Sequence, residues 1–212
     1  DHLLLGRITF DDVMDVREAE ATEDLLKFGG VSGDEDLGAD WREAVRSRLP
    51  WLLVNLATAF LAAMVPLYFS ATIEKLGFVA AYMGMVAGMG GNTGTQALAV
   101  NVRRLALGLI DFREFREVIR KEMLVGAVNG VATGLVAGAA AVAIQGTPMF
   151  GLVVFLAMTG NMVVAGVAGA FIPLLLKRYG IDPALASSVF VTTFTDTCGF
   201  FFLLGLSSWL LL

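Results

Sequence analysis

A single acidic residue interrupts an apolar stretch near the end of the sequence. Asp196 stands in VTTFTDTCGFF, within residues 183–212, which hold no other charged side chain. A carboxylate at the centre of a membrane helix costs about 2.5–3.5 kcal/mol on insertion scales, so we expect Asp196 to face protein or water rather than lipid. At helical spacing it shares one side with small and polar residues, and the opposite side is aromatic. The polar side comprises Ser188, Thr192, Thr195 and Gly199, and the aromatic side comprises Phe190, Phe194 and Phe201.

The chemistry that this polar stripe favours is the passage of a cation. No Lys or Arg lies near the middle of an apolar segment to neutralise Asp196, which weakens the alternative that it only holds helices together. A proton relay is a further alternative, but one carboxylate without a histidine or a second acid makes a poor relay. Magnesium suits the stripe, because Mg²⁺ keeps several waters and binds few carboxylates together with neutral oxygens. Thr192, one turn from Asp196, offers such oxygens.

One carboxylate cannot neutralise a divalent ion. Two chains related by a two-fold axis would place two copies of Asp196 around one pore, so the sequence favours a homodimer. Like charges this close would raise the pKa of one carboxyl unless a cation lies between them.

Five apolar segments are long enough to cross a bilayer as helices. The chain is 57% hydrophobic, and these segments cover residues 50–73, 76–102, 118–144, 149–176 and 183–212. Basic residues cluster before the first segment, between the second and third, and between the fourth and fifth. The positive-inside rule therefore predicts a cytoplasmic N-terminus and a C-terminus outside the cell. The fold class expected is an all-α membrane protein with five transmembrane helices, whose pore forms at the two-fold axis of a homodimer.

The second apolar segment contains MVAGMGGNTGTQALAVN, which is unusually rich in glycine and polar residues for a membrane helix. These glycines permit either a close approach of another helix or local unwinding beside a wet cavity. Asn92, Thr93 and Gln96 are expected to point toward the fifth segment and to line the pore or support Asp196. In the third segment a glycine recurs every four residues and predicts close helix packing, a theme that Gly84 and Gly88 extend into the second. The third-segment glycines are Gly126, Gly130, Gly134 and Gly138.

The first 48 residues are acidic and polar, and their excess of acidic side chains makes the net charge of the whole chain −5. Residues 2–10 are typical of a last strand of a small domain, and residues 11–28 of a helix that ends at Gly29 and Gly30. A linker and an amphipathic entry over residues 41–49 follow. The acidic helix is interpreted either as a solvated face or as a divalent-cation sensor, because its carboxylates repel one another at helical spacing. They are Asp11, Asp12, Asp15, Glu18, Glu20, Glu23 and Asp24.

Several classes of function fit the sequence poorly. An acidic balance gives no reason to expect a nucleic-acid partner. Intramembrane aspartyl proteolysis needs two aspartates on different helices, whereas Asp196 alone is available. The sole histidine, His2, lies outside the apolar segments, and no phosphate-binding loop is present. We therefore expect a transport protein rather than an enzyme. A transporter that exchanges Co²⁺ or Mn²⁺ for protons or sodium, and a membrane scaffold without transport, are the alternatives.

Three stretches of the sequence, taken in their order along the chain, resemble those of a known family. DDVMDVREAEATEDLLKFGGV, GGNTGTQALAVNVRRLALG and DPALASSVFVTTFTDTCGFF together resemble the MgtE family of magnesium channels, over essentially the whole chain. The resemblance implies that residues 1–10 are the tail of a CBS-type sensor domain, that residues 11–48 form a connecting "plug" helix and linker, and that residues 49–212 form a five-helix pore domain. Further sensor domains of the same chain would precede residue 1.

The family further implies a homodimeric Mg²⁺ channel in the bacterial cell membrane that closes when cytoplasmic Mg²⁺ is high. By position, Asp196 would be the pore carboxylate, and Thr192 would place a backbone oxygen near the ion. Mg²⁺ would clamp the connecting helix to the sensor domains, and its loss would let their charges push apart. The acidic positions that match the family's cytoplasmic Mg²⁺ sensor are Asp12, Asp15, Glu20, Glu23 and Asp24.

Overall fold

The structure is a computed structural model that describes the chain except residues 1–6, 32, 34, 36–37 and 184–186. All regular structure in the described part is helical. The α-helices are α1 (Phe10–Phe28), α2 (Trp41–Tyr68), α3 (Ser70–Lys75), α4 (Ala80–Ala106), α5 (Phe115–Gln145), α6 (Pro148–Arg178) and α7 (Ser187–Leu211), with 3-10 turns η1 (Gly77–Val79) and η2 (Phe112–Glu114). Most of the strand expected over residues 2–10 lies outside the described residues, and Phe10 already begins α1.

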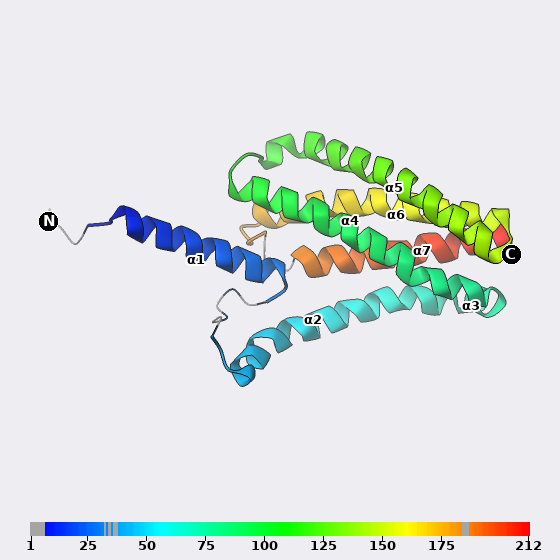
Figure 1. Ribbon diagram of the computed structural model, residues 1–212, viewed down its shortest axis with the longest axis horizontal. Coiled ribbons are helices and arrows are strands. Elements are labelled where there is room, and N and C mark those ends of the chain that lie inside the picture. The colour runs from blue at the N-terminus through cyan, green and yellow to red at the C-terminus, as the bar shows by residue number, and fades with distance from the viewer. Residues whose placement is uncertain (1–6, 32, 34, 36–37, 184–186) are drawn as a thin grey trace.

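The long helices α4, α5, α6 and α7 run side by side, whereas α2 stands apart along much of its length and α1 projects from one end (Figure 1). Helix α6 is the centre of the bundle, because it packs against α5, α4 and α7. Helix α2 packs mainly against α7, and Ala62 is its one buried residue. The apolar core therefore lies around α6.

The glycine ridge of α5 packs directly against α6, as predicted. A Cβ atom added at Gly126 would lie 2.5 Å from the Met162 carbonyl oxygen, and one at Gly138 would lie 2.7 Å from the Gly151 carbonyl oxygen. The Thr159 hydroxyl donates a hydrogen bond of 3.1 Å to the Gly130 carbonyl across the same contact. Small residues thus allow the two backbones to approach closely. Membrane helices commonly associate in this way, because burial of apolar surface does not drive their association within lipid.

Helix α4 is continuous, so its glycines serve close approach rather than unwinding. A Cβ atom at Gly94 would lie 2.5 Å from a methyl carbon of Val191 on α7, and one at Gly169 on α6 would lie 2.5 Å from the Gly94 carbonyl oxygen. The prediction for Gly84 and Gly88 is wrong, because nothing lies within 4 Å of a Cβ atom at either position. The α4 glycines that make contact lie on the side facing α6 and α7.

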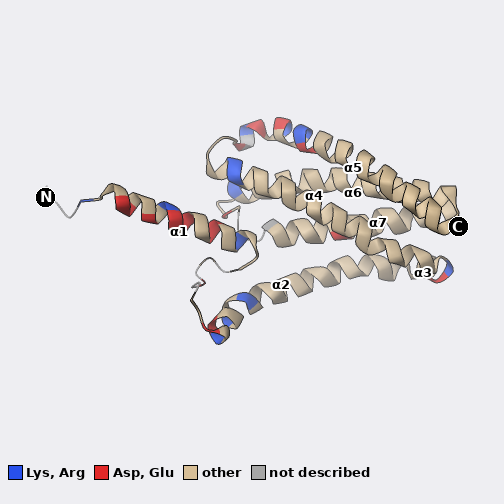
Figure 2. Ribbon diagram, viewed as in Figure 1, with Lys and Arg blue, Asp and Glu red and all other residues tan. Residues whose placement is uncertain are grey.

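Four helices are long and apolar enough to cross a membrane within the described residues: Trp41–Tyr68, Phe115–Gln145, Pro148–Arg178 and Ser188–Leu211. The second predicted span forms α4, whose 27 residues are helical but less apolar, because glycine, asparagine, threonine and glutamine replace aliphatic residues. Lys, Arg, Asp and Glu lie mainly on α1 and at helix ends, and the middles of the bundle helices are almost free of them (Figure 2).

The amphipathic entry predicted over residues 41–49 and the first predicted span are one helix. Helix α2 begins at Trp41 and continues through Pro50 and Pro66. Long membrane helices tolerate proline because neighbouring groups satisfy the freed carbonyls. The predicted boundary between residues 48 and 49 therefore falls inside a helix and does not mark the start of one.

Candidate functional site

Asp196 lies near the middle of α7 with a half-buried side chain. Within the described part of the chain, its carboxylate receives no hydrogen bond and forms no ion pair. The neighbouring threonines explain this, because each donates its hydroxyl proton to a backbone carbonyl of α7. The bonds run from Thr192 to Ser188 (2.8 Å), Thr193 to Val189 (2.8 Å), Thr195 to Thr192 (2.9 Å) and Thr197 to Thr193 (2.7 Å). Within the described residues, nothing therefore compensates the charge of Asp196.

The predicted polar stripe of α7 divides into an accessible part and a buried part. Ser188, Thr192 and Asp196 keep exposed surface, whereas Thr195 and Gly199 are buried against α4. A Cβ atom at Gly94 would lie 3.4 Å from the Thr195 methyl carbon, which shows how closely α4 covers this residue. Thr195 and Gly199 thus belong to the packed side of α7, and the accessible oxygens of the stripe belong to Ser188, Thr192 and Asp196. Phe190, Phe194 and Phe201 are exposed on the other side.

The polar side chains of α4 face a different helix from the one predicted. Asn92, Thr93 and Gln96 line a cavity of about 470 Å³ together with Asn129 and Thr133 of α5. The contact face of α4 explains the difference: its glycines turn toward α6 and α7, so the bulkier polar residues turn to the side of α5. The expectation that they point toward α7 is therefore wrong.

Two buried polar side chains belong to the site region but escaped the sequence analysis. Asn161 on α6 is fully buried between α4 and α7 and donates a hydrogen bond of 2.9 Å to the Val86 carbonyl. Its carbonyl oxygen is buried without a partner among the described residues. Glu122 on α5 is 5% exposed and lines a cavity of about 180 Å³ with Thr93, Gln96 and Asn129. A polar residue inside a predicted span was the available signal for both.

The acidic residues of α1 do not act as one cluster. Asp12 closes the N-terminal capping box: its carboxylate accepts a hydrogen bond of 2.7 Å from the Thr9 backbone N–H, and these Thr9 contacts lower the pKa of Asp12. Asp15 and Glu20 are exposed. Within the described residues, no three His, Cys, Asp or Glu side chains converge into a metal-binding group.

The end of α1 is tied to the connection before α7 by one lysine. Lys27 forms ion pairs of 2.5 Å with Glu23 and 2.7 Å with Asp182. Its hydrogen bonds to Asp182 and Glu23 raise the pKa of Lys27. Partial burial, with Asp182 nearby, raises the pKa of Asp24. An ammonium group thus bridges a carboxylate of α1 and one of the α6–α7 connection.

The long apolar helices define a multi-pass α-helical membrane protein. Residues 83–206 match the model of the MgtE family, described as divalent cation transporters, and the chain belongs to this family.

Proteins named magnesium transporter MgtE match nearly the whole chain. The one from Enterococcus faecalis is 36% identical over 92% of this chain, the one from Thermus thermophilus 35% identical over 98%, and the one from Bacillus subtilis 32% identical over 98%. These matches cover 43%, 46% and 46% of the respective relatives, so the chain spans less than half of their length.

Proposed function

We propose that this chain forms the ion pathway of a Mg²⁺ channel that admits Mg²⁺ to the cytoplasm down its electrochemical gradient. The observation that carries the proposal is Asp196, a half-buried carboxylate in a membrane helix without a donor or counter-ion among the described residues. Such a charge is costly in a membrane unless a cation or water meets it. A membrane potential contributes about 2.3 kcal/mol per charge per 100 mV, which drives a divalent ion inward without ATP.

The pore forms at the two-fold axis of a homodimer in this proposal. Asp196 provides one negative charge. Within the described residues it belongs to no group of three His, Cys, Asp or Glu side chains that could hold a metal ion. A second copy would supply a second Asp196 and balance one Mg²⁺. The ion keeps part of its water shell, which Mg²⁺ gives up reluctantly. Thr192 and Ser188 lie on the accessible side of α7 and provide hydroxyl and carbonyl oxygens to those waters.

Five spans per chain complete the proposed pore domain. Helix α4 runs beside α6 and α7 (Figure 1), and its 27 residues would reach about 40 Å at 1.5 Å per residue, enough to cross the apolar layer. Its polar side chains line a cavity shared with α5, where water can meet them. The basic residues near α2, between α4 and α5, and at the end of α6 support a cytoplasmic N-terminus and a C-terminus outside, by the positive-inside rule.

Gating by cytoplasmic Mg²⁺ would act through α1. In this proposal residues 1–10 belong to a sensor domain, residues 11–48 connect it to the pore, and residues 49–212 form the pore domain. The Lys27 bridge to Asp182 joins the connecting helix to the chain that leads directly into α7. A displacement of α1 would thus reach the helix that carries Asp196. Mg²⁺ bound by Asp12, Asp15, Glu20, Glu23 and Asp24, with ligands from upstream domains, would bias the closed state by its differential affinity.

The proposal is tested by ion flux into proteoliposomes that contain the purified protein. We expect Mg²⁺ uptake that rises with an inside-negative potential and does not respond to an imposed pH or sodium gradient. Uptake driven by a pH or sodium gradient would instead identify an exchanger of divalent cations. Absence of uptake at every potential, from protein shown to be folded, would contradict transport altogether.

A further inference from the structure

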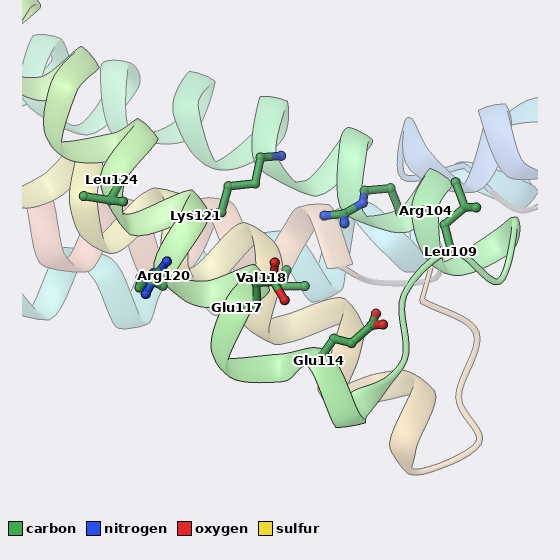
Figure 3. A pocket seen from close by; sticks show the side chains of 8 residues that line it. All are labelled: Arg104, Leu109, Glu114, Glu117, Val118, Arg120, Lys121 and Leu124. Carbon is green, nitrogen blue, oxygen red and sulfur yellow. The ribbon is translucent and has the colours of Figure 1, made fainter.

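A charged cavity of about 390 Å³ lies where α4 ends and α5 begins, away from α7. Figure 3 shows the Arg104 and Lys121 side chains reaching toward each other across the gap between these helices, whereas Arg120 points in another direction. The cavity is lined by Arg104, Leu109, Glu114, Glu117, Val118, Arg120, Lys121 and Leu124. Two cations thus face one space from two different helices.

Arg104 carries the clearest sign of a ligand. It is half-buried, and its Nη1 atom is buried without a hydrogen-bond partner in the described part of the chain. Leaving a buried donor of a charged group unpaired costs more than leaving a neutral donor unpaired, so an acceptor is expected beside it. A guanidinium is suited to phosphate oxygens because its N–H groups can bind two of them at once.

Lys121 leaves much of its charge available to such a ligand. Its ammonium lies 3.3 Å from the Glu122 carboxylate, and its side chain is 53% exposed. Glu114 and Glu117 line the same cavity but form no ion pair with Arg104 or Lys121 among the described residues. These two carboxylates are acceptors for hydroxyl or ammonium donors. The cavity therefore offers cations for a phosphate and acceptors for a polar group attached to it.

The apolar part of the lining distinguishes a lipid from a free anion. Leu109 and Leu124 are 63% and 56% exposed, and both border the cavity. Helix α5 is long and apolar enough to cross a membrane, and Lys121 lies in its second turn. Cations beside exposed leucines at the end of such a helix match the boundary between head groups and acyl chains. Basic pockets between membrane helices bind anionic head groups in this position.

We propose that this cavity binds the head group of an anionic phospholipid of the phosphatidylglycerol type. Arg104 and Lys121 hold the phosphate, Glu114 and Glu117 accept hydrogen bonds from the glycerol hydroxyls, and Leu109 and Leu124 contact the first methylenes of the acyl chains. The lipid thereby joins the end of α4 to the start of α5, which otherwise share little direct contact. This site does not depend on the proposed ion pathway.

The test measures lipid binding to the purified, delipidated protein in detergent with short-chain probes. We expect dioctanoyl phosphatidylglycerol to bind more tightly than dioctanoyl phosphatidylcholine, with inorganic phosphate unable to displace it. Each cation near a head group contributes about 1 kcal/mol, so Arg104→Gln should weaken binding about fivefold and the Arg104→Gln, Lys121→Gln double variant about 25-fold. Arg116→Gln is the matched control, because Arg116 is an exposed arginine of α5 outside the cavity.

Three results would overturn the proposal. Equal binding of the two lipids would show that the negative charge of the head group does not contribute to binding. Full displacement by inorganic phosphate would identify a free-anion site. An Arg116→Gln effect as large as that of Arg104→Gln would indicate diffuse surface attraction. Arg104→Lys keeps the charge and should retain more binding than Arg104→Gln, and size-exclusion profiles matched to the unmodified protein separate lost binding from lost folding.

Discussion

Carboxylates in two regions of this molecule are treated in opposite ways. At the end of the bundle near α1, Glu23 and Asp182 share the Lys27 ammonium, and Glu122 lies beside the Lys121 ammonium. In the middle of α7, the threonine hydroxyls around Asp196 donate their hydrogen bonds to backbone carbonyls, and the carboxylate has no partner within the described residues. The difference teaches that the uncompensated charge, and not acidity as such, marks the proposed ion site.

Removing the charge of Asp196 should have the largest effect. We expect Asp196→Asn to lower Mg²⁺ uptake at least about 100-fold, because a charge about 4 Å from an ion at an effective dielectric constant near 20 is worth about 4 kcal/mol. Initial rates of uptake into proteoliposomes measure the effect. Phe194→Leu, an exposed change on the other side of the same helix, is the control and should stay near the unmodified rate. Full uptake by Asp196→Asn would show that the uncompensated charge of Asp196 does not mark the ion site.

Disturbing the position of α7 should have the next largest effect. A Cβ atom at Gly94 meets the Val191 side chain at 2.5 Å, so Gly94→Leu should push α7 away from α4 and destabilise the fold by about 1–3 kcal/mol. We expect uptake to fall about tenfold, and a thermal unfolding scan in detergent reports the loss of stability. Gly88→Leu places the same side chain where nothing lies within 4 Å. Equal losses for both variants would show that α4 does not position Asp196 through Gly94.

Breaking the Lys27 bridge should have a smaller effect, confined to regulation. The Lys27 side chain is 17% exposed and that of Asp182 is 39% exposed, so solvent screens the pair and we expect about 0.2–1 kcal/mol from it. In the protein that carries the proposed upstream sensor domains, Lys27→Gln should therefore shift the Mg²⁺ concentration that half-closes the channel by at most about fivefold, without changing the fully open rate. Arg17→Gln, an exposed change on the same helix, is the control. A lowered open rate would show that Lys27 supports the pore itself.

The sequence was sufficient for features that depend on one helix alone. A lone charge among apolar residues drew attention to Asp196, which the structure shows to be half-buried, and a glycine at every fourth position predicted the close packing of α5. The end of α1 followed from the two glycines after Phe28, whereas its start at Phe10 lies one residue before the predicted start and depends on the Thr9 cap. Each of these signals is periodic or local, so no knowledge of a partner helix is needed.

Features that depend on the choice of a partner helix could not be predicted in the same way. Glycines occur on several sides of α4, and only packing against α6 and α7 selects Gly90 and Gly94 over Gly84 and Gly88. Because these glycines of α4 face α6 and α7, the other side of α4, with Asn92 and its polar neighbours, faces α5. The sequence shows Asn161 as a polar residue inside a predicted span, but its burial between α4 and α7 and its hydrogen bond to Val86 depend on how these helices pack.

The smallest expected effect comes from the buried carboxylate of α5. Glu122 is more deeply buried than Asp196, and Lys121 already lies beside it, so its charge is not available to a passing ion in the way that Asp196 is. Glu122→Gln keeps the shape and removes the charge, and we expect uptake within about twofold of the unmodified protein, because a partly exposed pair contributes about 0–1 kcal/mol. Uptake rates measured in one series with Asp196→Asn provide the check. A loss as large as that of Asp196→Asn would mean that ions pass through the cavity between α4 and α5. A neighbouring lysine would then not distinguish a structural carboxylate from one that contacts the passing ion.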